Sequence, residues 1–171
     1  MDKYQERYLE HIENKMHREQ KKHLYEVDAI KGVYEVIENR KSIRRFNGRG
    51  LSDSIYTIIQ KAIDTSPSSC NRKGIYAVQV SPGYAERVLV GGANWISKAD
   101  KVFFLYGAKE CYKNPKEIAY MPYLDAGFIG QNIYLLCELY GVGCCYVNPN
   151  LREPIESNDY FCGAVAVGNY A

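Results

Sequence analysis

The chain has 171 residues, a length typical of one domain with a single hydrophobic core. Hydrophobic residues make up 46% and charged residues 25%, which is ordinary globular usage and excludes a disordered or fibrous chain. The formal net charge of +2 does not indicate nucleic-acid binding. The charged N-terminus is not a secretory signal, and no apolar stretch reaches the ~18 residues of a membrane span. We therefore expect a cytoplasmic protein without nucleic-acid or membrane partners.

The cysteines are the first candidates for disulfide or metal chemistry. They are Cys70, Cys111, Cys137, Cys144, Cys145 and Cys162. None of them forms a CxxC pair, and most lie within apolar stretches. In a chain without a signal peptide this pattern favours buried free thiols over a disulfide framework. We expect no metal site.

The N-terminal half of the chain predicts three helices. Residues 2–28 form a charged stretch whose apolar residues recur at every fourth position, which predicts an amphipathic helical arm. Periodicity does not decide whether this arm packs across a partner subunit, folds back on its own or is mobile, and we expect residues 29–171 to form a single domain. A second helix is predicted at about Ala29–Asn39. Ser52 or Asp53 can cap a third helix, which ends before Ser66.

The remaining elements are strands and one long helix. Short runs rich in β-branched and aromatic residues predict strands at Ile75–Val80, Val102–Tyr106, Cys144–Val147 and Gly163–Val167. The segment Tyr123–Tyr140, with Pro122 at its start, predicts a helix that is apolar on more than one side and therefore buried. Because helices and strands do not alternate as strict βαβ units, the pattern predicts an α+β fold.

Two polar segments are candidates for binding. Arg40, Lys41, Arg44 and Arg45 surround Ser42, a combination that holds a phosphate well but also occurs on ordinary solvated faces. The loop 68–74 (SSCNRKG) offers hydroxyl, amide and cationic donors before a strand, which suits a flat polar heterocycle or an ordinary turn. There is no Walker loop, Ser-His-Asp order or HExxH pair, so the sequence shows no hydrolase machinery.

Four segments in order resemble the nitroreductase family of flavin-dependent oxidoreductases. Residues 40–46 (RKSIRRF) are similar to the family's RRSIRxF signature, and residues 67–72 (PSSCNR) to its APSxxNxQP loop. The stretch from residue 125 to residue 143 resembles the family's long central helix and GLG ending. Residues 164–168 (AVAVG) resemble the strand that ends in IGYP.

This resemblance implies a nitroreductase-like fold, with a mainly antiparallel sheet flanked by helices, in a homodimer that binds FMN at the subunit interface. The positions that match cofactor-binding residues of the family fall in three segments. Arg40, Lys41, Ser42 and Arg44 match residues that hold the FMN phosphate and ribityl chain, while Ser68, Ser69 and Asn71 match a loop that reaches the ring, usually from the partner. Tyr146, Val147 and Asn148 match a stretch whose backbone lies against the ring and donates to N5.

The resemblance also implies a function. FMN takes hydride from NAD(P)H at N5 and passes reducing equivalents to a nitroaromatic, quinone or similar electron-poor acceptor, so no catalytic side chain is required. A cation near the flavin N1 and the C2 carbonyl stabilises the reduced form. Lys41, Arg44 and Lys73 are the candidates for that cation.

The sequence departs from the family pattern in three places. One is the region between Tyr106 and Pro122, which is too short for a large helical lid and predicts an open pocket with broad substrate choice. Lys73 and Gly74 replace the glutamine and proline of the loop, and the chain ends at Ala171, so we expect a short member without the usual C-terminal extension. These departures leave an alternative open, a catalytically reduced flavin-binding or dimeric interaction module. A second alternative is a specialised enzyme of the superfamily, for flavin fragmentation or reductive dehalogenation.

Overall fold

The computed structural model describes residues 27–170, with side chains described from Gly32 onward. It divides the chain into two compact units, one ending at Glu38 and the other starting at Asn39. Most of the predicted arm, residues 2–26, lies outside the described residues, so the arm and the domain boundary after residue 28 stay predictions. Within the first unit, helix α2 (Val27–Asn39) begins two residues before the predicted start at Ala29.

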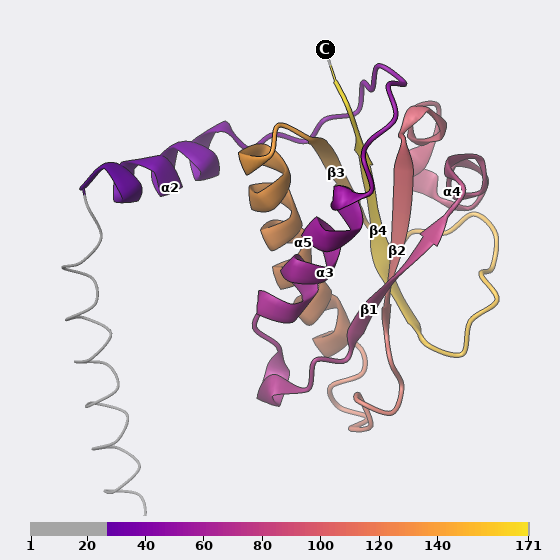
Figure 1. Ribbon diagram of the computed structural model, residues 1–171. Helices are drawn as coiled ribbons and strands as arrows, with labels where there is room; N and C mark the ends of the chain where they lie inside the picture. The colour runs from indigo at the N-terminus through magenta and orange to yellow at the C-terminus, as the bar shows by residue number, and fades with distance from the viewer. Residues whose placement is uncertain (1–26, 171) are drawn as a thin grey trace, which may run out of the picture. The chain divides into compact units, whose positions relative to one another are not determined.

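The second unit is built on one four-stranded sheet (Figure 1). Its strands are β1 (Ile75–Val80), β2 (Lys101–Gly107), β3 (Gly143–Val147) and β4 (Tyr160–Gly168). They lie in the order β1-β2-β4-β3, and every neighbouring pair is antiparallel. The α+β prediction with an antiparallel sheet is therefore confirmed.

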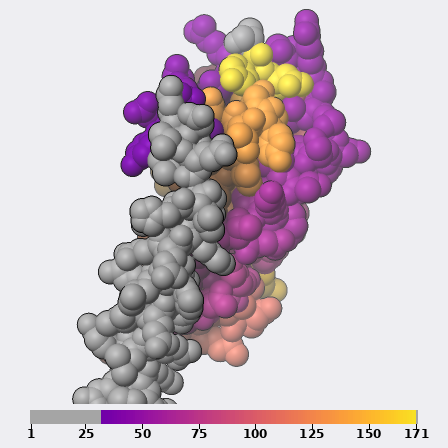
Figure 2. Space-filling view, turned by 60° about the vertical axis from the view of Figure 1, so that its left-hand side comes forward, coloured from indigo at the N-terminus to yellow at the C-terminus, as the bar shows by residue number. Residues whose placement is uncertain are grey.

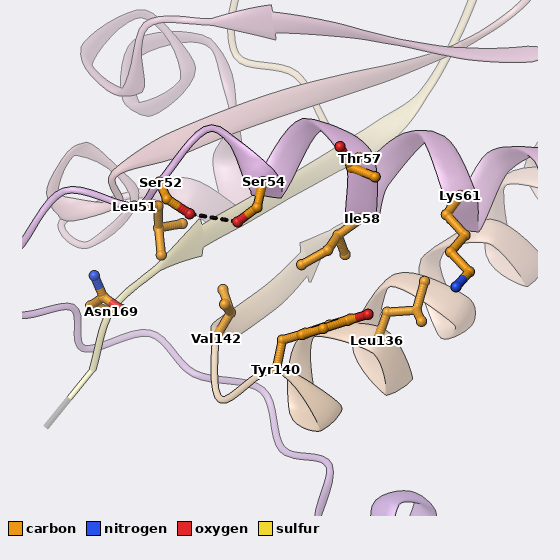
Figure 3. A pocket seen from close by; sticks show the side chains of 10 residues that line it. All are labelled: Leu51, Ser52, Ser54, Thr57, Ile58, Lys61, Leu136, Tyr140, Val142 and Asn169. Atoms are coloured by element: carbon orange, nitrogen blue, oxygen red, sulfur yellow. Dashed lines mark hydrogen bonds between the residues drawn. The ribbon is translucent and has the colours of Figure 1, made fainter.

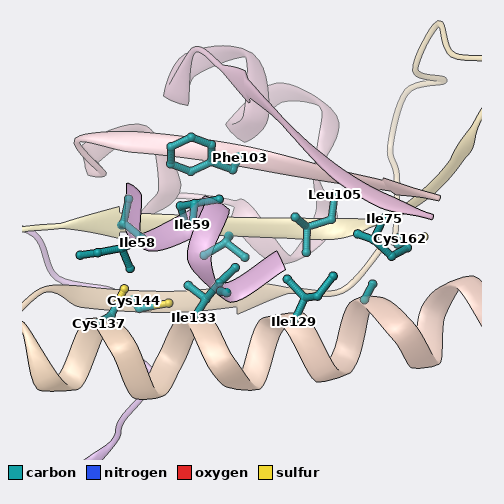
Figure 4. Close-up of a cluster of buried hydrophobic side chains, with 14 of the residues drawn as sticks. Ile58, Ile59, Ile75, Phe103, Leu105, Ile129, Ile133, Cys137, Cys144 and Cys162 are labelled. Atoms are coloured by element: carbon teal, nitrogen blue, oxygen red, sulfur yellow. The ribbon is translucent and has the colours of Figure 1, made fainter. Parts of the chain in front are cut away.

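Side chains of the sheet alternate between two hydrophobic clusters, as the two-residue period of a strand requires. On β2, Phe103 and Leu105 enter a cluster formed with helices α3 (Ser54–Thr65) and α5 (Met121–Leu139), shown in Figure 4. The alternate residues of β2, Val102, Phe104 and Tyr106, enter a second cluster with helix α4 (Pro82–Val88). The sheet is thus covered on both faces, with α3 and α5 together on one of them (Figure 1). Short 3-10 helices lie at Ser69–Asn71, Val90–Gly92 and Ile96–Lys98.

Helix α5 is buried on one side only. Its sheet-facing side carries Ala126, Ile129 and Ile133, all buried in the first cluster. The outward-facing apolar residues of this helix and its C-cap remain exposed: Tyr123, Leu124, Phe128, Leu139 and Tyr140. The predicted burial is confirmed for the sheet-facing side, and cover of the outer side by the partner of a homodimer stays a prediction. Between residues 27 and 170, no helix is both long and apolar enough to cross a membrane.

The cysteine prediction is confirmed in its main point. All six cysteines are free thiols, and Cys137, Cys144, Cys145 and Cys162 are buried. Cys137 of α5 and Cys144 of β3 lie side by side in the first cluster (Figure 4). Burial and the neighbouring Cys137 thiol raise the pKa of Cys144, so both behave as apolar packing groups. Cys70 differs, because it is exposed on the loop after α3.

Candidate functional site

The basic segment 40–46 is tied to the end of the sheet beside β3. The Ile43 N–H donates to the Cys144 carbonyl at 2.8 Å, and the Asn47 N–H donates to the Asn169 carbonyl at 2.9 Å. These bonds fix the backbone of the segment along the outer edge of β3.

Two apolar side chains anchor this segment against glycines. A methyl group at Gly168 would lie 2.6 Å from Phe46 Cδ1, and one at Gly143 would lie 3.0 Å from Ile43 Cγ2. Only glycine permits so close an approach. Lys41, Ser42 and Arg44, which lie between or beside these anchors, are exposed to solvent.

Tyr134 of α5 connects the basic segment to β3. Its hydroxyl accepts the Tyr146 N–H at 2.8 Å and lies 2.9 Å from Ser42 Oγ. The Arg40 guanidinium lies over the Tyr134 ring, 5.1 Å from its centroid. Arg40 and Ser42 therefore converge on one residue. Burial raises the pKa of Tyr134, so the hydroxyl keeps its proton.

Arg44 lies on the other side of the same cluster. Its guanidinium is 5.9 Å from the centroid of the Trp95 ring. The buried Cys145 thiol lies near the Arg44 charge, and its Sγ donates to the Tyr146 carbonyl at 3.6 Å. Burial raises the pKa of this thiol, and the Arg44 charge opposes the shift.

The four basic side chains of the segment have no acidic partners within the described part of the chain. Salt bridges there join Arg72 to Glu117, Arg87 to Glu153 and Lys101 to Asp53, and none involves residues 40–46. Two guanidinium groups and an exposed hydroxyl with no carboxylate partner form a donor set that suits a phosphate. The residues present therefore fit the phosphate of FMN. By contrast, no group of His, Cys, Asp or Glu suited to a metal occurs among the described residues.

The three predicted positions at the end of β3 and just beyond it differ in whether their donors are free. The Tyr146 N–H already donates to the Tyr134 hydroxyl, and the Tyr146 hydroxyl donates to the Cys162 carbonyl at 2.6 Å. Within one chain, Tyr146 therefore has no free donor for the flavin ring, although a role there was predicted. The Val147 side chain is buried in the second cluster. Asn148 is exposed, and the strand period places its N–H on the same outer edge as that of Tyr146. Asn148 is thus the backbone donor that remains.

The loop after α3 has a strained backbone. Cys70, Asn71 and Lys73 have positive φ values of 52°, 53° and 52°, a conformation that residues other than glycine rarely adopt. Such strain persists only where surrounding contacts hold the chain, and it clusters at functional sites. Asn71 is exposed, so the loop presents its amide to solvent.

Asp125 of α5 holds this loop in place. Its carboxylate is fully buried and accepts the Ser69 N–H at 2.9 Å and the Ser69 hydroxyl at 3.0 Å. The Tyr112 hydroxyl donates to the same carboxylate at 2.8 Å. Burial and this bond raise the pKa of Tyr112. Ser69, predicted to reach the flavin, therefore has its hydroxyl engaged within the protein.

Ser68 and Lys73 also stabilise the loop. The Lys73 N–H donates to Ser68 Oγ at 3.0 Å. The Lys73 ammonium donates to the carbonyls of Asp64 and Ser66, at 3.0 and 2.6 Å, and so caps the end of α3. A role for Lys73 at the flavin edge stays a prediction, but its ammonium is already held by two acceptors.

Arg72 is the member of the loop with an unmet donor. It pairs with Glu117 at 2.8 Å, and this bond raises the pKa of its guanidinium. Its other terminal nitrogen, Nη1, is buried and has no hydrogen-bond partner among the described residues.

The basic segment and the loop are attached at different positions along α5. The loop is bound at Asp125 near the start of α5, whereas the segment is bound at Tyr134. At ~1.5 Å rise per residue these positions are about 14 Å apart along the helix. A single chain therefore presents two half-sites.

A separate pocket lies between α3 and the end of α5 (Figure 3). It has a volume of about 460 Å³, with Leu51, Ile58 and Leu136 among its apolar lining residues. In Figure 2 the yellow end of the chain lies beside the orange residues around the end of α5, on the face where this pocket opens. None of the predicted site residues lines this pocket.

Comparison with known proteins gives one family match. The family model described as "Putative TM nitroreductase" matches residues 32–171. No curated protein sequence matches the chain.

Solved structures share the fold at low sequence identity. A protein from Parabacteroides distasonis named "Putative NADH dehydrogenase/NAD(P)H nitroreductase" is 19% identical, with a TM-score of 0.66 over 80% of this chain and 86% of that one. A nitroreductase from Desulfovibrio desulfuricans, solved in complex with FMN, is also 19% identical, with a TM-score of 0.65 over 81% and 86%. A protein from Clostridium acetobutylicum named "Putative NADH Oxidase" is 21% identical, with a TM-score of 0.65 over 78% and 86%.

Proposed function

The chain belongs to this nitroreductase family, and from that premise we propose that it is an FMN-dependent oxidoreductase. The reductant is NAD(P)H, and the acceptor is a nitroaromatic, a quinone or a similar electron-poor compound. The bound flavin supplies the electron transfer between them. The observation that carries the proposal is that Arg40 and Arg44, on either side of Ser42 in the segment, have no carboxylate partner among the described residues.

Each part of the site has its own task in this proposal. Arg40 and Arg44 neutralise the FMN phosphate, and Ser42 donates to it. The Asn148 N–H, at the outer edge beyond β3, donates to the ring. Because no side chain in this cluster is an activated nucleophile, the protein binds and orients the cofactor and leaves the chemistry to it.

The second half-site comes from a partner subunit. The exposed apolar face of α5, with Tyr123, Leu124 and Phe128, is the surface through which two copies associate. Such a homodimer brings the strained loop of one subunit, with Asn71, toward the basic segment of the other. This arrangement accounts for the separation of the two half-sites along α5.

Titration of FMN into the purified protein tests the cofactor assignment. Arg44→Ala removes one charge-assisted bond, worth ~1.5–3 kcal/mol, so FMN affinity should fall roughly ten- to a hundredfold. Arg45→Ala is the matched control, because Arg45 is exposed in the same segment and its side chain makes no hydrogen bond, ion pair or ring contact with the described residues. A protein that does not bind FMN supports the alternative, an interaction module without catalysis.

Light scattering tests the assembly. Phe128→Glu places a charge on the exposed face of α5, so the mass should fall from dimer to monomer and FMN binding should weaken with it. Val78→Glu on β1, at a residue of similar exposure, is the control. A Phe128→Glu protein that remains dimeric would place the interface elsewhere.

A further inference from the structure

Tyr134 lies at the centre of the basic cluster, although the family resemblance gives it no role. We propose that Tyr134 is a positioning residue that directs the Ser42 hydroxyl proton toward the bound phosphate. This inference rests on the proposed function, because it assigns the donor and the acceptor of each hydrogen bond in the part of the site that binds the FMN phosphate.

The direction of each hydrogen bond follows from its donor. The Tyr146 N–H can only donate, so the Tyr134 oxygen is the acceptor in that 2.8 Å bond. The phenol proton then needs an acceptor of its own, and Ser42 Oγ lies 2.9 Å away. The neighbouring Cys145 sulfur is a weaker acceptor than an oxygen. In the proposed arrangement Tyr134 is accordingly the donor to Ser42.

This direction decides what Ser42 can do. A serine hydroxyl has one proton, and when its oxygen accepts from Tyr134 that proton is not used in the contact. Ser42 is exposed, so the proton is available to an anion in solvent. Chains of hydrogen bonds polarise one another, so donation by Tyr146 and Tyr134 makes Ser42 a better donor.

The ring of Tyr134 has a second task. The Arg40 guanidinium lies 5.1 Å from its centroid, within the range of a cation–π contact. The ring thus holds a cation beside the same hydroxyl. Tyr134 therefore orients two of the groups that face the phosphate without facing it itself.

Comparing FMN with riboflavin tests the inference, because riboflavin lacks the phosphate. Tyr134→Phe keeps the ring beneath Arg40 and removes the hydroxyl. We expect FMN affinity to fall about tenfold, the effect of one hydrogen bond to a charged group, while riboflavin affinity is unchanged. Flavin fluorescence quenching measures both affinities. The control is Tyr84→Phe, since the half-buried Tyr84 hydroxyl has no hydrogen bond in the described residues.

A double-mutant cycle with Ser42→Ala separates positioning from general packing. If Tyr134 acts through Ser42, the double variant should bind FMN no more weakly than Ser42→Ala alone. Unchanged FMN affinity in Tyr134→Phe, an equal loss of FMN and riboflavin, or fully additive effects would each overturn the inference. A wild-type protein that binds no FMN would instead overturn the proposed function, and this inference with it.

Discussion

The two polar segments that the sequence singled out, residues 40–46 and residues 68–74, differ in how their donors are used. In the basic segment the backbone is bonded to the sheet, and the exposed Lys41, Arg44 and Arg45 have no carboxylate partner among the described residues. In the loop, Ser69 and Lys73 use their side chains to hold the loop itself. Polar groups that already have partners shape a backbone, whereas unpaired groups beside them are left for a ligand.

The loop and the basic segment also differ in backbone strain. The loop holds positive φ angles at Cys70, Asn71 and Lys73, and the bonds to Asp125 offset their cost. The basic segment has no residue at positive φ before Gly48, and two apolar anchors suffice to hold it. A ligand that contacts both segments therefore binds a loop whose shape is held by buried hydrogen bonds and a basic segment whose shape is held by apolar packing.

The largest expected effect is at the loop. Asp125→Asn replaces an acceptor-only carboxylate with an amide, whose NH2 group cannot accept from Tyr112 or Ser69. The free energy of unfolding should fall by about 2–4 kcal/mol, because buried donors lose their partner. Urea denaturation measures this change. Asp53→Asn, at an exposed carboxylate 3.7 Å from the Lys101 ammonium, should change the stability by less than about 1 kcal/mol.

A smaller effect is expected at the anchor of the basic segment. Gly168→Ala places a methyl group 2.6 Å from Phe46 Cδ1, so Phe46 must shift. Overpacking of this kind costs roughly 1–3 kcal/mol, measured by thermal or urea unfolding. FMN affinity should fall as well, because Phe46 holds the segment that carries Arg44. Gly83→Ala is the control, since nothing lies within 4 Å of the added group. Unchanged FMN affinity in a destabilised Gly168→Ala protein would show that the anchor does not position the cations.

Much of the fold could be predicted from periodicity. Strand β1 occupies Ile75–Val80 as predicted, and the long helix begins near Pro122 as the sequence indicates. These elements follow from local patterns of apolar residues, which the sheet and helix then bury. The apolar outer face of α5 has no cover within the described residues of one chain, in line with the prediction that one domain is too small to bury the whole helix.

The residues that organise the site could not be found in this way. Asp125 binds Ser69 across 56 positions of sequence, and Tyr134 meets Ser42 across 92. Hydrogen bonds over such separations leave no local pattern. One available signal was a charged residue, Asp125, in the apolar first half of α5, because a buried carboxylate requires donors.

The smallest expected effect depends on pH and isolates one bond of the loop network. Tyr112→Phe removes the hydroxyl that donates to Asp125, which should lower the free energy of unfolding by about 1–2 kcal/mol at pH 7. Burial and this bond raise the pKa of Tyr112 in the folded protein, so folding favours its neutral form. The contribution is fully present below the unfolded tyrosine pKa of ~10 and is lost as pH rises toward the folded value. The stability difference between wild type and Tyr112→Phe should therefore shrink above pH ~10, as urea unfolding at a series of pH values would measure. Tyr120→Phe, at an exposed tyrosine, serves as the reference. A difference that stays constant across this range would mean that Tyr112 ionises alike in both states and that the Asp125 bond does not hold the loop.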